Sequence, residues 1–170
     1  MPGYYRNKAR LGLRLRPVQT RKEIVDSTSL GVSGGTTSTV TLVNTVNDYT
    51  GTVADVKTGS VIKGLYLFVQ LVNESSSVNV DWYIAKIPAN MSGFPVPGAT
   101  GGDAQRRWIL HEEKGIPGST TQGQGPLTFR GFIRIPPKLR RMGEDDKIQL
   151  LLRSSQIHDF CIKAIYKVFV

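Results

Sequence analysis

The feature that most constrains the fold of this chain is a series of strand-length segments in which apolar and polar residues alternate. Residues 127–135 and 159–170 show it most clearly, since apolar side chains recur at alternate positions with Arg or Lys between them. Such alternation places successive side chains on opposite faces of a half-buried β-strand. Helical periodicity is scarce after residue 22, so the body of the chain is predicted to be all-β.

Alternation, β-branched residues and turn-like breaks together predict about eight strands. They cover residues 24–32, 37–46, 61–73, 78–87, 106–112, 127–135, 147–153 and 159–170. Two long Pro/Gly/Ser-rich loops are expected at 88–104 and 115–126, and one short helix at Pro137 to Met142, closed by Gly143. Eight strands without amphipathic helices favour an antiparallel sandwich, most economically an eight-stranded jelly roll.

The side-chain pattern also predicts which faces are buried. In 127–135, Phe129 and Ile133 should face the core while Arg130 and Arg134 face away from it. In the last strand the inward set is Phe160, Ile162, Ala164, Tyr166 and Val168, and Lys163 and Lys167 share the other face. Residues 61–73 are apolar on both faces in their centre, so we expect a second sheet to cover one face and a neighbouring subunit the other.

The N-terminal segment is strongly basic. Residues 1–22 contain no acidic residue and seven basic ones, Arg6, Lys8, Arg10, Arg14, Arg16, Arg21 and Lys22. Residues 23–170 contain 15 Lys and Arg against 13 Asp and Glu, so the segment supplies +7 of the formal net charge of +9. We therefore divide the chain into a basic extended arm, 1–22, and a sandwich domain, 23–170.

Such an arm is suited to neutralising phosphates, which needs charge and flexibility but no fixed geometry. Tyr4 and Tyr5 beside Arg6 are placed to stack on unpaired bases. The alternative is a solvated basic tail that aids solubility or targeting. Two further basic clusters, Arg106-Arg107 and Lys138/Arg140/Arg141, either face nucleic acid, pair with acidic residues of another copy or are ordinary surface charges.

Residues with catalytic or metal-binding chemistry are few. The single cysteine, Cys161, excludes an intrachain disulfide and a Cys-based zinc site. His111-Glu112-Glu113 lacks the second histidine of a zinc-protease helix. His158-Asp159 has no recognisable nucleophile turn to accompany it. We expect no enzyme activity, no metal and no cofactor, and an exposed turn at 144–146, where cation binding is left open.

Neither a membrane span of about 20 apolar residues nor a secretory signal is recognisable in the sequence.

The arm and the strand pattern together resemble a known family. The carrying segments are YYRNKARLGLRLRP, VIKGLYLFVQLVN, VNVDWYIAKIP, RRWILHEEKGIPG, FRGFIRIPPKLRRMGEDDKIQLLL and the terminal strand. They span nearly the whole chain and resemble the single-jelly-roll capsid proteins of small circular, Rep-encoding single-stranded DNA viruses, including those with coats like that of satellite tobacco necrosis virus.

The resemblance implies a homo-oligomeric icosahedral shell, with the sandwich as its shell domain and the arm directed inward onto a packaged genome. It implies single-stranded DNA as the cargo, no membrane partner, and a location in the virion and, during assembly, in the host cell, with the nucleus left open. The arm is shorter and less Arg-rich than many in that family, and RNA is not excluded as cargo. The alternative is a non-viral β-sandwich binding module, for nucleic acid or carbohydrate, with a basic tail.

Overall fold

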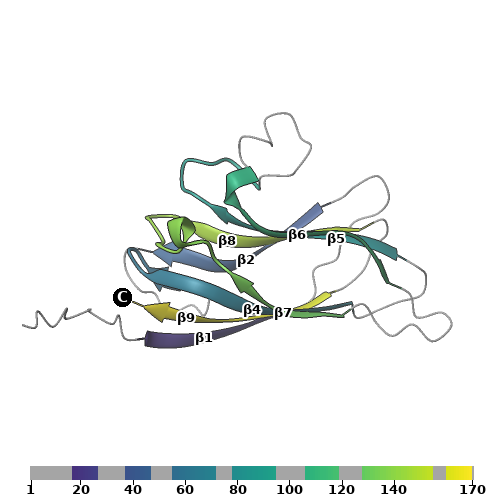
Figure 1. Cartoon of the computed structure of the whole chain (residues 1–170), viewed down its shortest axis with the longest axis horizontal. Coiled ribbons are helices and arrows are strands. Elements are labelled where there is room, and N and C mark those ends of the chain that lie inside the picture. The colour runs from purple at the N-terminus through teal and green to yellow at the C-terminus, as the bar shows by residue number, and fades with distance from the viewer. Residues whose placement is uncertain are drawn as a thin grey trace, which may run out of the picture.

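The computed structural model describes residues 17–26, 37–46, 55–71, 78–94, 106–118, 128–154 and 160–169. Over these ranges the strands form two sheets that lie face to face (Figure 1). Sheet A contains, in spatial order, β1 (Pro17–Asp26), β9 (Phe160–Phe169), β4 (Val61–Leu71) and β7 (Thr128–Arg134). Sheet B contains β3 (Asp55–Lys57), β2 (Thr37–Val46), β8 (Lys147–Ser154), β5 (Val78–Ile87) and β6 (Ile109–Gly118).

The order of the strands is that of a jelly roll. Apart from the three-residue β3, each sheet has four strands, and the chain changes sheet at every step except from β5 to β6. All strand pairs are antiparallel except β2 with β3. The predicted all-β jelly-roll sandwich is therefore confirmed, with β3 as an additional strand too short to show alternation.

The core lies between the sheets and follows the predicted faces. In β9 the inward residues from Phe160 to Val168 are all buried, while those between them are half-buried or exposed. Phe129 is half-buried and Ile133 is buried, whereas Arg130 and Arg134 are exposed. One face of β4 packs into the core as expected. Its other face is the outer face of sheet A, on which Figure 1 shows no labelled element.

Two strand boundaries differ from the prediction. β1 runs over Pro17–Asp26 rather than 24–32, and residues 27–32 lie outside the described part of the chain. The backbone of β1 pairs with β9, and backbone pairing does not require apolar residues at alternate positions. Residues 17–22, which include Arg21 and Lys22, were therefore assigned to the basic arm and not to a strand. Residues 106–108 form a 3₁₀ helix, η1, and β6 continues to Gly118, into the first residues of the loop predicted at 115–126. Pro117 is tolerated because β6 is an edge strand.

The predicted helix over 137–142 is shorter than expected. Only Pro137–Leu139 form a 3₁₀ helix, η2. The following backbone pairs with residues 59–62 instead, through Ile62 N–H to the Arg140 carbonyl at 2.9 Å and Met142 N–H to the Ser60 carbonyl at 2.8 Å. Gly143 does not act as a left-handed cap, because the described glycines with positive φ are Gly59 and Gly93.

Candidate nucleic-acid interface

The seven cations of the predicted arm fall into two groups. Five of them, Arg6, Lys8, Arg10, Arg14 and Arg16, lie outside the described residues. Arg21 and Lys22 belong to β1, where their backbones lie opposite Tyr166 and Ile165 of β9. The last six residues assigned to the arm are therefore part of sheet A, and the basic segment 1–16 joins the sandwich at an edge strand of that sheet.

The two sheets differ in charge. The strands of sheet A contain seven Lys or Arg and two Asp or Glu, a net charge of +5. The strands of sheet B contain five Lys or Arg and four Asp or Glu, a net charge of +1. Both acidic residues of sheet A lie in β1, so β4, β7 and β9 together have five basic residues and no acidic one. A surface of one sign attracts a partner of the opposite sign.

These five basic residues lie on the face of sheet A that points away from the core. Lys63, Arg130, Arg134 and Lys167 are exposed, and Lys163 is half-buried. The alternation in the sequence predicted the outward positions in β7 and β9 separately. Their proximity depends on β4, which pairs with β7 on one side and β9 on the other. No local pattern in the sequence could have shown that they form one surface.

The basic cluster at 106–107 has partners within the same chain. The Arg106 guanidinium lies 3.1 Å from the Glu112 carboxylate, with both side chains partly exposed to solvent. The Arg107 guanidinium lies 5.3 Å from the centre of the Trp108 ring. Exposed ion pairs of this kind contribute about 0–1 kcal/mol. This cluster therefore has the character of an ordinary charged surface in the monomer.

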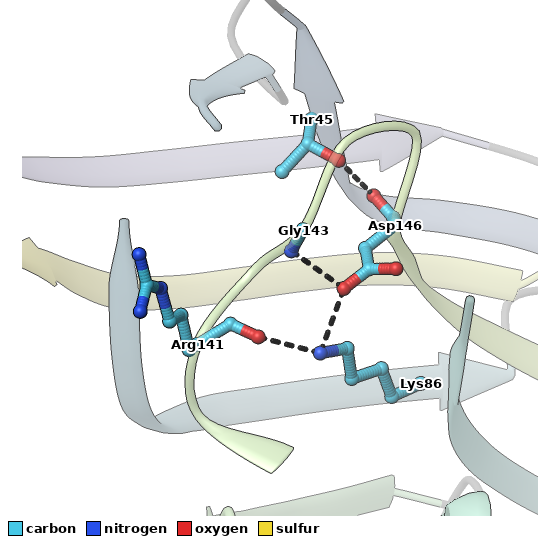
Figure 2. A network of polar contacts seen from close by, with 5 residues as sticks. All are labelled: Thr45, Lys86, Arg141, Gly143 and Asp146. Atoms are coloured by element: carbon cyan, nitrogen blue, oxygen red, sulfur yellow. Dashed lines mark hydrogen bonds and ion pairs between the residues drawn. The ribbon is translucent and has the colours of Figure 1, made fainter. Parts of the chain in front are cut away.

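The second basic cluster contacts a buried ion pair through the backbone of Arg141. Lys86 Nζ lies 2.7 Å from Asp146 Oδ2 and donates to the Arg141 carbonyl at 2.6 Å. Asp146 Oδ2 also accepts the Gly143 N–H at 2.6 Å, and the Asp146 carbonyl accepts the Thr45 hydroxyl at 2.6 Å. Figure 2 shows these contacts joining β2 and β5 to the segment before β8. Both charged side chains are about one-tenth exposed or less.

The sequence did not indicate this pair. Residues 144–146 were expected to form an exposed turn, which holds for Glu144 and Asp145 but is wrong for Asp146, which is buried. Lys86 lies in a strand between Ala85 and Ile87, which are both buried. The sequence does not show that the Lys86 side chain is buried as well, and so gave no reason to expect a charged partner for it. Because Lys86 ties β5 to the segment before β8 through Asp146 and the Arg141 carbonyl, the arrangement has the character of a structural clamp.

His111 lies in an aromatic cluster between the sheets. Its ring centre is 4.8 Å from that of Trp82 and 5.9 Å from that of Phe129, and its Nε2 is 3.1 Å from Glu113 Oε1. Within the described residues no three His, Cys, Asp or Glu side chains are grouped to hold a metal ion. The dyad His158-Asp159 lies outside the described residues. Cys161 is half-buried.

In the described part of the chain, no helix has the length and apolar character needed to cross a membrane.

Comparison with known proteins identifies no family. No protein-family model and no curated protein sequence matches the chain. Among solved structures it is similar to one of the Gx strain of infectious bursal disease virus, with 12% identity over 91% of this chain and a TM-score of 0.41. It is also similar to Desmodium yellow mottle tymovirus, with 12% identity over 89% of this chain and 87% of that one, and a TM-score of 0.40.

A third similarity, to the Gt strain of infectious bursal disease virus, has 10% identity and a TM-score of 0.39 and covers 98% of this chain. The chain spans about a third of the length of the two infectious bursal disease virus chains, with 32% and 36% covered. At such values the similarities do not assign a function to this chain.

Proposed function

We propose that the protein is the subunit of a self-assembling viral capsid and that its basic N-terminal segment binds the packaged nucleic acid. The observation that carries the proposal is the position of residues 1–16, which contain five basic and no acidic residues. They precede β1, an edge strand of the sheet whose other three strands have five basic and no acidic residues. The chain therefore leads from the basic segment directly into the basic sheet.

This arrangement suits a shell with a polyanion on one side. Sheet B, with a net charge of +1, is the layer suited to face away from the genome. Many copies in one closed assembly would bind the same strand together, so that a modest charge per subunit yields a high total affinity. Single-stranded DNA as the cargo and the virion as the location follow from the family resemblance and belong to the same proposal.

The test combines particle size with salt-dependent binding. Light scattering and negative-stain microscopy of the full chain, with and without single-stranded DNA, should show closed particles. Deleting residues 1–16, which leaves β1 whole, should lower the slope of log affinity against log salt. For single strands that slope is about 0.7 per neutralised phosphate, so five charges account for up to about 3.5 units. Small species under all conditions would favour the non-viral binding module, and an unchanged slope would refute a role for the segment.

A further inference from the structure

Aromatic rings lie among the cations on the outer face of sheet A. Phe132 is 66% exposed and is the exposed large hydrophobic residue of the described part of the chain. Phe132 of β7 lies opposite Tyr66 of β4, and Tyr66 in turn lies opposite Ile165 of β9. In the neighbouring cross-strand row, Phe68 lies between Arg130 and Lys163. The first row thus places two aromatic rings side by side, and the second places a cation on each side of the Phe68 ring.

A hollow lies beside these rings, next to a glycine over which the Phe132 ring packs closely. The pairing of β4 with β9 is shifted between Ile62 and Leu65, so that Lys63 and Gly64 share the interval that Lys167 occupies on β9. A side chain at Gly64 would collide with the Phe132 ring and the Ile133 carbonyl oxygen. The hollow has a volume of about 290 Å³, near the lower end of ligand pockets, which span about 300–1,000 Å³. Its lining includes Lys63, Gly64, Tyr66, Phe132, Lys167 and Phe169.

Cations contact the rings directly. Lys63 Nζ lies 4.5 Å from the centre of the Phe169 ring. The Arg130 guanidinium lies 5.8 Å from the centre of the Tyr66 ring, and its Nε–H donates to Tyr66 Oη. A guanidinium has five N–H donors, so four of those of Arg130 remain on its two terminal nitrogens. The same residues thus offer ring faces for stacking and charged donors for phosphate.

We propose that the outer face of sheet A is a second binding site for single-stranded nucleic acid, in which unpaired bases stack on Phe132 and Tyr66 and the surrounding cations contact phosphates. The inference rests on the proposed function and adds a site in the folded domain. Ring faces combined with a basic surface are the pattern by which proteins bind single strands without sequence preference. A second copy of this face, or the basic segment 1–16, would bring like charge against like charge, so neither is the occupant. In this proposal nucleic acid takes the place of the neighbouring subunit that the sequence of residues 61–73 led us to expect.

The experiment compares two probes that share phosphates but differ in bases. Fluorescence anisotropy measures binding of a 20-nucleotide oligothymidine and of an abasic strand of equal length, with the full chain and with a chain lacking residues 1–16. F132A should weaken oligothymidine binding about 5- to 150-fold, the range for loss of one stacked base, and leave abasic binding unchanged. F132Y, which keeps an aromatic ring at this position, should bind oligothymidine with the affinity of the wild type. Because Phe132 is largely exposed, these variants should fold normally.

The cations are tested separately with a matched control. R134Q/K167Q should weaken binding of both probes and lower the salt slope by up to about 1.4. K57Q/K147Q removes two cations from sheet B that are likewise exposed, and it should change neither the affinity for the two probes nor the salt slope. Equal binding of oligothymidine by wild type and F132A in both chain lengths would overturn the inference, as would binding of the shortened chain to phosphatidylserine vesicles but not to oligothymidine.

The two proposals fail in different ways. If deletion of residues 1–16 lowers affinity and F132A does not, the segment binds nucleic acid and the sheet face does not. If F132A lowers affinity in the full chain and the deletion has no effect, the sheet face binds nucleic acid and the role of the segment is refuted.

Discussion

Replacing Lys86 by Met tests the role of the buried ion pair. The substitution removes the cation that lies 2.7 Å from Asp146 Oδ2 and the donor to the Arg141 carbonyl, and it keeps an unbranched side chain of similar length. The Asp146 carboxylate then lacks its cationic partner in a site where its side chain is 10% exposed. Removing one partner of a buried pair costs about 3–5 kcal/mol, because the remaining charge is uncompensated.

That cost is a large share of the stability of a domain, which is about 5–15 kcal/mol. For a chain of this size, 1 kcal/mol lowers the melting temperature by about 2–4 °C, so K86M should lower it by about 6–20 °C. Urea denaturation followed by circular dichroism measures the free energy of unfolding, with the chain kept monomeric and checked by light scattering. The control is R106Q, which breaks the exposed pair with Glu112 and should cost about 0–1 kcal/mol.

The double substitution K86M/D146N separates the pair from the individual side chains. It removes both charges, and the amide introduced by D146N still offers an oxygen to the Gly143 N–H. We expect the double variant to be more stable than K86M alone, with a coupling energy of about 2–3 kcal/mol. A loss below about 1 kcal/mol for K86M, or a coupling energy near zero, would refute the view that this pair clamps the segment before β8.

Two further predictions concern alkaline stability and the boundary of the domain. Burial raises the pKa of Tyr83 above 10.0, the carboxylates of Asp81 and Glu112 raise it further, and Arg153 opposes them. Its contribution to stability is therefore complete below about pH 10 and is lost as the pH rises above that value. Y83F should lose less stability than wild type between pH 9 and pH 11 in thermal melts, and equal losses would contradict this assignment. Deleting residues 1–16 should leave the melting temperature unchanged, whereas deleting 1–26 removes β1 and exposes the edge of β9, which should cause aggregation or loss of cooperative unfolding. A soluble, cooperatively folded chain without residues 1–26 would show that β1 is dispensable.

The candidate interface was predictable only in parts. The charge of the basic segment can be counted from the sequence, and alternation correctly placed Arg130 and Arg134 on the outer side of their strand. The extent of β1 could not be predicted, because its pairing with β9 is made by backbone groups that every residue except proline carries. The hollow at Gly64 depends on a shift of register between β4 and β9, which no single strand encodes.

The sequence by itself determined the all-β class, most of the strands, the inward faces of β7 and β9, and the separation of a basic N-terminal segment from a nearly neutral body. These follow from local properties, since side chains alternate across a strand with a period of two and charges can be counted. Only the tertiary structure decided that β9 lies between β1 and β4, that Asp146 is buried against Lys86, and that the cations and rings of three strands form one face. Those features join residues far apart in the chain through backbone pairing and packing, and the local pattern of residues does not specify them.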